Sequence, residues 1–439
     1  MTLLELTPRM VIGDRLATLP VVIVGAGPIG LAAAANLVER GIDFVILEAG
    51  SDIASSVRLW GHTRLFSPWR HLIDPAARRL LEQTNWIAPD EGVAPTGQQL
   101  IDGYLVPLAR LDAISSRIRL GARVTAVTRE GMDRTRSAGR AQAPFLLRLE
   151  NSDGSATELT GRAVIDASGT YTTPNPLASS GLEPLGAARA GDRVLHALPD
   201  VLGADRVRFE GRHTTIVGAG HSAANSLIAL AELAETSPET RVTWLIRNPS
   251  AVRVSSSPDD ELADRARLGS RVDQLVAAGA ITKIDSFEIS RLDMIGDKLR
   301  VAGTRHGEPV THDTDLVVNA AGFRPDLAML REVRLDLDAI VEAPQRLAPL
   351  IDPNIHSCGT VEPHGFRELI HPEPGFFIVG MKSYGRAPTF LLATGYEQVR
   401  SVTAWLNGDM SSASEIQLTL PATGVCSTDP FIGGGSCCS

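Results

Sequence analysis

The chain has 439 residues, of which 44% are hydrophobic, and its formal net charge at pH 7 is −9. A chain of this length can form two or three domains, each with its own hydrophobic core. The acidic balance argues against a surface that binds nucleic acid. Residues 1–15 carry charges and no apolar run, so we expect no signal peptide, no membrane partner and a cytoplasmic location.

The first organised stretch is residues 21–48, VVIVGAGPIGLAAAANLVERGIDFVILE. It reads as an apolar strand, a glycine turn, a helix of small residues and a second strand that ends on an acid. In this pattern Gly25 makes the tight turn, Gly27 lets the backbone approach a pyrophosphate, and Gly30 lets the helix pack closely on the strand. Glu48 stands where a carboxylate binds a ribose hydroxyl. The series predicts a dinucleotide site in an α/β fold.

Residues 51–69 are rich in Arg, Trp and Pro. In a flavoprotein this segment would lie against the cofactor, which makes Arg58, Arg64 and Ser67 candidates for contacts with phosphate or flavin. Ordinary salt links on a surface loop explain each of these side chains equally well. The sequence leaves both interpretations open.

The next stretch reads as a β-meander followed by a strand that returns to the first sheet. The meander strands are expected at residues 122–128, 145–150 and 156–159. The turn signal NSDG joins the last two as a hairpin. The following run, AVIDASG at residues 163–169, is an apolar strand that ends in small residues. We therefore expect Asp166 and Gly169 to lie near the bound cofactor.

A second glycine turn follows in TTIVGAGHSAANSLIALAELAE, which begins at Thr214. Gly218 and Gly220 occupy the first two glycine positions and Ala223 the third, so the same phosphate-binding geometry is available. The pattern predicts a second dinucleotide site. Two dinucleotides in one chain indicate hydride transfer from a nicotinamide to a flavin.

The strand after the second turn, residues 241–246, ends on Arg247 instead of an acid. A guanidinium at this position can bind the 2′-phosphate of NADPH, which favours NADPH over NADH. A solvated strand end accounts for this arginine alone equally well. The identity of the nicotinamide cofactor therefore rests on its side chain.

Two later segments are expected to complete the fold. Residues 315–326, DLVVNAAGFRPD, mark the exit from the nicotinamide domain, and residues 376–381 form a late strand in which Gly380 passes close to the flavin. A helix over residues 389–406 follows, with its positive dipole end toward the flavin. We predict two Rossmann-like domains, the second inserted in the first. Their expected bounds are 1–173 with 350–406 for FAD, 174–349 for NADPH, and 407–439 for a flexible tail.

Together these motifs resemble the flavin-containing monooxygenases, a group within the two-dinucleotide-binding flavoproteins. The resemblance is carried by GAGPIG with Glu48, by GAGHSAANS at residues 218–226 and by NAAGFRPD at residues 319–326. It implies FAD and NADPH as cofactors. It also implies that FAD is bound by Gly25, Gly27, Gly30 and Glu48, and NADPH by Gly218, Gly220, Ser222 and Arg247.

One signature of that family, FxGxxxH, is only partly kept. The local sequence AGDRVLH offers Gly191 and His196 with one extra residue between them and no leading Phe. Both a structural and a catalytic role are open for His196.

The end of the chain is rich in Gly and Ser and reads GGGSCCS. It resembles the C-terminal arms of mercuric reductase and of high-molecular-weight thioredoxin reductases, which carry adjacent cysteines to a partner subunit and so imply a homodimer. No cysteine precedes Cys358, so the CxxxxC pair that those reductases hold beside the flavin is missing. Cys426, Cys437 and Cys438 are the candidate catalytic thiols. They also suit a thiophilic ion, trivalent arsenic with three sulfurs or mercury with two.

Three hypotheses follow. In the first, NADPH reduces FAD and a soft substrate captured by the tail thiols is oxygenated, as in the flavin monooxygenases of arsenic-resistance clusters. In the second, FAD passes electrons to the Cys437–Cys438 pair and on to a disulfide or metal ion. In the third, the protein is a metal-binding or sensing module with a structural flavin. The second glycine turn argues against a sensor, since a sensor needs no nicotinamide site.

Overall fold

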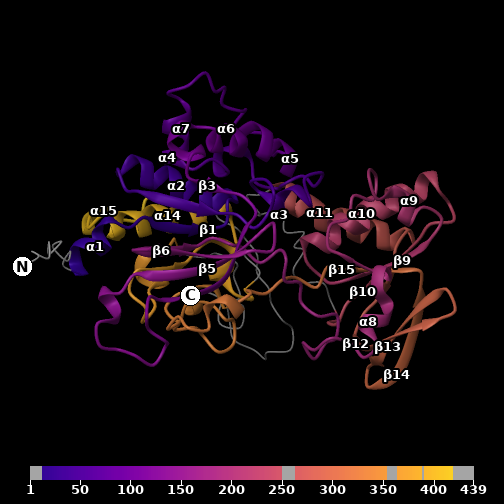
Figure 1. Cartoon of the computed structure of the whole chain (residues 1–439). Helices are drawn as coiled ribbons and strands as arrows, with labels where there is room; N and C mark the ends of the chain where they lie inside the picture. The colour runs from indigo at the N-terminus through magenta and orange to yellow at the C-terminus, as the bar shows by residue number, and fades with distance from the viewer. Residues whose placement is uncertain (1–11, 250–262, 353–362, 388–389, 419–439) are drawn as a thin grey trace, which may run out of the picture.

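The computed structural model describes residues 12–249, 263–352, 363–387 and 390–418. Figure 1 shows two α/β domains side by side, each built on a parallel sheet. In the described part of the chain, no helix combines the length and the apolarity that a membrane crossing needs.

The first sheet has the strand order β16-β7-β1-β2-β3, and all its strands pair in parallel. Its strands are β1 Val21–Val24, β2 Phe44–Leu47, β3 Ile118–Arg119, β7 Ala163–Asp166 and β16 Phe376–Ile378. At the carboxyl edge, Val24 pairs with Leu47 on one side and with Asp166 on the other. The late strand β16 thus closes a sheet that the N-terminal residues begin.

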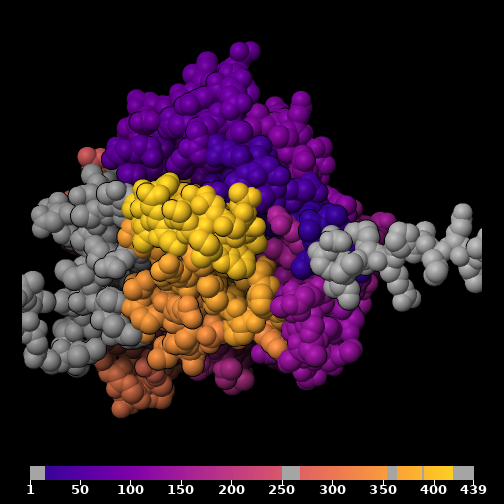
Figure 2. All heavy atoms as spheres, turned by 90° about the vertical axis from the view of Figure 1, so that its left-hand side faces the viewer, coloured from indigo at the N-terminus to yellow at the C-terminus, as the bar shows by residue number. Residues whose placement is uncertain are grey.

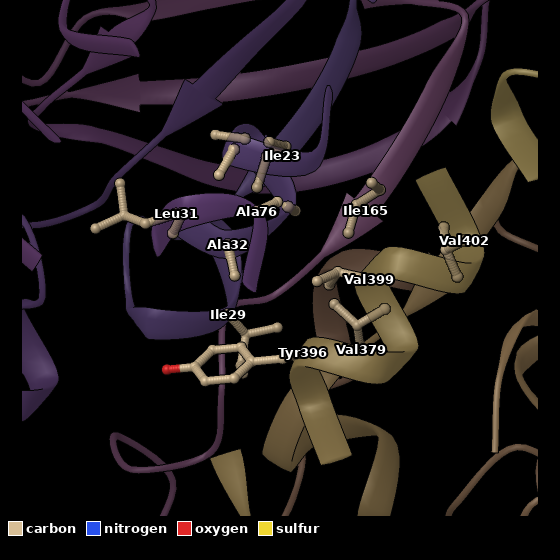
Figure 3. Packing of buried hydrophobic residues seen from close by; sticks show 14 of the residues in the cluster. Ile23, Ile29, Leu31, Ala32, Ala76, Ile165, Val379, Tyr396, Val399 and Val402 are labelled. Atoms are coloured by element: carbon tan, nitrogen blue, oxygen red, sulfur yellow. The ribbon is translucent and has the colours of Figure 1, made fainter. Parts of the chain in front are cut away.

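Both faces of this sheet are covered, which explains why β1 is apolar at every position. Val21 and Ile23 belong to the core under the helices, whereas Val22 and Val24 face the other core, as alternation along a strand requires. Figure 3 shows the helical side, where Leu31 of α2 Pro28–Glu39 and Val399 of α14 Leu392–Leu406 lie near Ile23.

The opposite face is covered by the antiparallel meander β4 Ala122–Arg129, β5 Phe145–Asn151 and β6 Ala156–Gly161. Phe145 and Leu147 of β5 pack in the same core as Val22. The three strands lie close to the ranges expected from sequence. The helix expected at residues 389–406 has the observed bounds 392–406.

The second sheet has the order β11-β10-β9-β15-β8 and is also parallel. Its strands are β8 Val194–His196, β9 His213–Val217, β10 Arg241–Leu245, β11 Thr282–Ile284 and β15 Leu316–Asn319. The helices α10 His221–Thr236 and α11 Ala263–Ala277 lie together beside it. A second meander packs on the other face, with strands β12 Phe287–Ile295, β13 Lys298–Arg305 and β14 Glu308–Thr314. The two domains thus share one plan.

Two chain crossings join the domains and are hydrogen-bonded to each other. Asn319 Nδ2 donates to the carbonyl of Asn175 over 2.8 Å, and the Asn175 backbone N–H donates to the carbonyl of Gly322 over 2.9 Å. Pro174 and Phe323 form an antiparallel bridge between the same segments. The first crossing thus includes Pro174 and Asn175.

The chain re-enters the first domain soon after the second crossing. Leu330 and Val333 pack in the core under the first meander, and Leu347 packs in the core of the helical side. The inserted domain therefore ends near residue 323, earlier than the expected boundary at 349. The segment between them has short apolar runs without the period of a strand or helix, so its sequence gives no sign of which core it joins.

The two ends of the described chain also meet. Figure 2 shows the yellow C-terminal segment at the surface beside indigo and purple N-terminal segments. The ion pair between Arg40 and Asp409, 3.5 Å long, joins these segments.

The short helices are α1 Ile12–Thr18, α3 Ser55–Arg58, α4 Pro75–Leu81, α5 Gly97–Leu100, α6 Val106–Ala109, α7 Asp112–Ser115, α8 Ala187–Ala190, α9 Arg206–Phe209, α12 Ala348–Ile351, α13 Phe366–Leu369 and α15 Met410–Ser414.

Candidate functional site

The first glycine turn leaves β1 at the carboxyl edge of the first sheet. Gly25 has φ +102°, and a Cβ on Gly30 would lie 1.9 Å from the Gly25 carbonyl oxygen, so neither position accepts a side chain. A Cβ on Gly27, in contrast, would meet no atom within 4 Å. Gly27 also caps the N-terminus of α2, where backbone N–H groups favour an anion. This open backbone fits a pyrophosphate.

Glu48 follows β2 and braces this turn. Its carboxylate accepts hydrogen bonds from the backbone N–H of Ala26 over 2.8 Å, from that of Gly50 over 2.9 Å and from the Ser55 hydroxyl over 3.1 Å. A carboxylate has about four acceptor positions, so one remains for a ribose hydroxyl. Glu48 therefore fixes the loop and keeps one acceptor position open.

Asp166 lies one strand away from the turn, but its carboxylate is held by the protein. The Lys382 ammonium is 2.7 Å from Asp166 Oδ2, and the Ser168 hydroxyl donates to Asp166 Oδ1 over 2.6 Å. Lys382 also donates to the Ser168 hydroxyl over 3.1 Å. Asp166 thus lies at the carboxyl edge of the sheet, near the expected cofactor site. Its charge is compensated by Lys382.

Gly169 and Gly380 leave the ends of the two neighbouring strands, β7 and β16. Gly169 has φ +71° and open space at its Cβ position, whereas a Cβ on Gly380 would lie 3.0 Å from Ile29 at the start of α2. The Gly380 N–H donates to Gln398 Oε1 over 2.7 Å. Gly169 is therefore the more open of the two toward a ligand, and Gly380 packs against the first turn of α2.

Sequence reasoning missed the side chains that hold this edge. Lys382 pairs with Asp166, and Gln398 on α14 donates to the Ser383 hydroxyl over 2.9 Å and lies 2.8 Å from His364 Nε2. The signal for Lys382 was a lone charge directly after the apolar run FFIVGM. Gln398 carried no comparable signal, because Glu397 and Ser401 stand near it on the same helix.

The arginines of residues 51–69 make contacts within the protein. Arg58 forms an ion pair of 2.9 Å with Asp52, and Arg64 donates to the carbonyl of Ala94 over 2.5 Å. Ser67 is buried. For both arginines the structure fits the interpretation as local links of the loop.

The second glycine turn repeats the first. Gly218 has φ +134°, and a Cβ there would lie 2.1 Å from the Ala320 carbonyl oxygen, while a Cβ on Gly220 would meet no atom within 4 Å. Gly220 caps α10, whose first turn contains Ser222. Ala223, at the third position, is buried. This turn offers the same open backbone to a second pyrophosphate.

Arg247 follows β10, two residues beyond its last strand residue, and its side chain is exposed. Within the described part of the chain, its guanidinium donates to the Ser179 carbonyl over 3.5 Å, a long contact. The guanidinium is therefore available to a phosphate at the edge of the second turn. Across the domain interface, the rings of Phe66 and His221 lie 5.1 Å apart at the start of α10.

His196 ends strand β8 at the domain interface. Its ring lies 4.6 Å from that of Tyr171 and 5.5 Å from that of Phe323, both on the crossing segments. It also lines a cavity described below. Gly191 lies outside β8, with φ +47°. The aromatic contacts give His196 a structural role. The residue also remains part of the cavity lining.

The cysteines fall outside the residues that the structure describes. This applies to Cys358 and to the three candidate thiols Cys426, Cys437 and Cys438. In the described ranges, no three His, Cys, Asp or Glu side chains are grouped as a metal site would need. The catalytic and metalloid-binding roles of the three tail thiols therefore remain predictions.

Comparison with solved structures finds this architecture along nearly the whole chain. A bacillithiol disulfide reductase from Bacillus cereus matches with a TM-score of 0.66 and 20% identity, over 89% of this chain and 99% of that chain. A flavin monooxygenase from Stenotrophomonas maltophilia matches with a TM-score of 0.58 and 22% identity, over 89% and 98%. The fold is that of the two-dinucleotide-binding flavoproteins.

Sequence comparison finds similarity to a disulphide oxidoreductase family and to a monooxygenase, each over part of the chain. Residues 22–134 match the family described as pyridine nucleotide-disulphide oxidoreductase. Indole-3-pyruvate monooxygenase YUCCA6 from Arabidopsis thaliana is 33% identical over 205 residues, which are 46% of this chain and 42% of that protein. The chain thus matches less than half the length of this curated relative.

Proposed function

We propose that the protein is an FAD- and NADPH-dependent oxidoreductase in which a hydride passes from a nicotinamide in the second domain to a flavin in the first. The observation that carries this proposal is the pair of equivalent glycine turns, each open at its second glycine, Gly27 or Gly220. When bound, FAD supplies a two-electron acceptor that reacts with oxygen or with another acceptor. The chain itself supplies the two phosphate sites and their orientation.

The residues around the first glycine turn would bind FAD, and those around the second would bind NADPH. Gly25, Gly27 and Gly30 shape the FAD pyrophosphate site, and Glu48 takes the ribose. Gly169 and Gly380 line the neighbouring strand ends, above the Asp166 carboxylate. In the second domain, NADPH is bound by Gly218, Gly220, Ser222 and Arg247.

We favour a flavin monooxygenase. The curated relative is a monooxygenase, and the chain has no cysteine before Cys358, so a CxxxxC pair next to the flavin is ruled out by composition. For the substrate we propose a soft, thiophilic compound such as a trivalent organoarsenical, captured by Cys426, Cys437 and Cys438. One oxygen atom would go to the arsenical and the other would leave as water.

The alternative is a disulfide or metal-ion reductase. Two findings favour it, the family match of residues 22–134 and the likeness to the bacillithiol disulfide reductase. Electrons would then pass from the flavin to the Cys437–Cys438 pair and on to the substrate. In this mechanism oxygen is not needed.

Stopped-flow spectroscopy of the purified protein separates the two functions. We would reduce the flavin with NADPH without oxygen, and then mix the protein with oxygen, with methylarsenite plus oxygen, or with a disulfide or mercuric ion alone. A monooxygenase is reoxidised by oxygen and yields pentavalent arsenical. Rapid anaerobic reoxidation by the disulfide or mercuric ion, lost in Cys438→Ser and kept in the control Cys358→Ser, would establish the reductase instead. Absence of flavin reduction by NADPH would reject both.

A further inference from the structure

A cavity of about 320 Å³ lies where the two domains meet. The first domain contributes Leu59, the first crossing segment contributes Tyr171, and the second domain contributes Asp192, His196 and Arg208. Its volume is at the small end of ligand sites, which span roughly 300–1,000 Å³. A ligand the size of an amino acid would fill it.

The cavity lies beside the second dinucleotide turn and not on it. His196 is in register with Asn319, which is in register with Val217, the residue before the turn. Two strand spacings separate His196 from Val217, a distance of about 10 Å. All three residues lie at the carboxyl edge, where α/β sheets bind their ligands. A ligand in the cavity would thus neighbour a nicotinamide without occupying its phosphate site.

One wall of the cavity is aromatic and rigid. The Tyr171 ring lies 4.6 Å from that of His196, and the Tyr171 hydroxyl donates to the Ala197 carbonyl over 2.9 Å. The next residue, Leu198, has φ +61°, a conformation that costs about 1 kcal/mol or more in a residue other than glycine and that gathers at functional sites. Leu59, which the first domain contributes to the rim of the cavity, is 63% exposed. The wall and this rim suit an apolar group.

Charged residues of both signs line the cavity, namely Arg208, Asp192 and Asp205, and none of the three forms an ion pair among the described residues. Arg208 donates to the backbone carbonyl of Asp192 over 3.1 Å, and it forms no ion pair among the described residues. No hydrogen bond of the Asp192 carboxylate occurs in the same described part of the chain. Asp205, a further lining residue, accepts a bond from the Asp200 N–H over 2.9 Å and so belongs to its own turn. Arg208 and Asp192 are thus available to a ligand.

We propose that this cavity binds a small zwitterion of the amino-acid type with an apolar side chain. The carboxylate of the ligand pairs with Arg208, its ammonium with Asp192, and its side chain packs between Leu59 and Tyr171. This inference goes beyond the proposed function, because neither glycine turn nor any cysteine takes part. It assigns to the domain interface an organic ligand whose carboxylate and ammonium are each bound by a side chain of opposite charge.

Isothermal titration calorimetry on the FAD-loaded protein tests the site. The probes are L-phenylalanine, L-leucine and L-methionine, with 2-phenylethylamine and 3-phenylpropionate as analogues that keep one charge each. We expect binding of at least one amino acid, and a loss of about tenfold or more in affinity for each single-charge analogue, since a charged hydrogen bond is lost. No binding by the three amino acids, or equal binding by the analogues, would overturn the proposal.

Variants locate the binding on the cavity. Arg208→Met and Asp192→Asn should each weaken binding about tenfold or more, and Leu59→Trp should block it by filling the rim while both charges stay. The exposed Arg212 and Asp297 give matched controls, Arg212→Met and Asp297→Asn, which should bind normally. Unchanged binding in Arg208→Met would contradict the assignment.

Two further measurements separate this site from the dinucleotide sites. Binding should persist in saturating NADP⁺, because the cavity lies two strands from the turn; complete loss would mean that the nicotinamide occupies the cavity and would overturn the proposal. Flavin reduction by NADPH is recorded for the same samples. If reduction fails while amino-acid binding holds, the proposed function fails and this inference stands.

Discussion

The Asp166 carboxylate and the Lys382 ammonium form an ion pair 2.7 Å long whose side chains are 0% and 1% exposed. Asp166 ends strand β7 and pairs in register with Ile378 of β16, four residues before Lys382. The pair therefore ties the chain's late return to the strand that lies next to the first glycine turn. A buried pair of this kind is neutral as a whole, but either member alone is a buried charge.

Lys382→Met should therefore strongly destabilise the protein. It leaves the Asp166 carboxylate buried and uncompensated, which costs about 3–5 kcal/mol in the free energy of unfolding. Urea denaturation measures this change, and the double variant Asp166→Asn with Lys382→Met should recover part of it. Lys298→Met is the control, since Lys298 is 42% exposed in its pair with Asp315 and should cost only about 1 kcal/mol or less. A similar cost for the two single variants would refute this account.

Because the Cβ position of Gly27 is open, a substitution there can impair cofactor binding without impairing folding. Its φ of −80° suits any residue and its Cβ position is empty, so Gly27→Ala should lose only about 1 kcal/mol or less of stability, because alanine is a poorer N-cap than glycine. The added methyl would occupy the approach of the pyrophosphate, and FAD affinity should fall about tenfold or more. Flavin absorbance per protein and thermal melting measure the two effects.

Gly30→Ala is the matched contrast. Its Cβ would lie 1.9 Å from a backbone oxygen, so the helix must shift away from the strand and melting should fall clearly. If Gly27→Ala retains FAD, or melts as early as Gly30→Ala, the assignment of the open face to the pyrophosphate is wrong.

Much of this architecture follows from the sequence because short segments carry it. The run of four apolar residues in β1 and the glycines after it predict a strand covered on both faces and a phosphate turn. The same holds for Gly218 and Gly220. In each case the reason lies within about thirty residues, where backbone sterics and apolar spacing decide the structure.

The rest depends on contacts between segments far apart in the chain. Lys382 pairs with a residue 216 positions away, and Leu59 and Arg208 line one cavity only because the domains pack together. No local pattern specifies such a partner. For the same reason the end of the inserted domain was expected too late, since the segment from Leu330 to Leu347 joins the first core by tertiary packing alone.

Arg247 is expected to select NADPH. Arg247→Ala removes a charged hydrogen bond to the 2′-phosphate, worth about 1.5–3 kcal/mol, so the KM for NADPH should rise roughly tenfold to a hundredfold. The KM for NADH should stay unchanged. Steady-state NAD(P)H oxidation measures both, with Arg212→Ala as the control. An equal change for both cofactors would show that Arg247 does not contact this phosphate.

Asp74 should make stability depend on pH. Burial raises the pKa of its carboxyl from 3.8 to about 7, against the hydrogen bonds from the Ala77 N–H and Asn36 and the charge of Arg79. Because the pKa of the folded state lies above that of the unfolded state, its contribution is complete below about pH 4 and is lost as the pH rises to about 7. The shift from 3.8 to about 7 corresponds to a loss of up to about 4 kcal/mol.

Asp74→Asn keeps an acceptor for the Ala77 N–H but cannot titrate. The stability of the wild-type protein relative to this variant should therefore fall across that pH range, as urea denaturation at several pH values would measure. Subtracting the variant cancels the other titrating groups, and the exposed Asp297→Asn should show no such trend. A constant difference between wild type and Asp74→Asn would mean that Asp74 is already ionised in the fold, with its charge stabilised by Asn36 and Arg79.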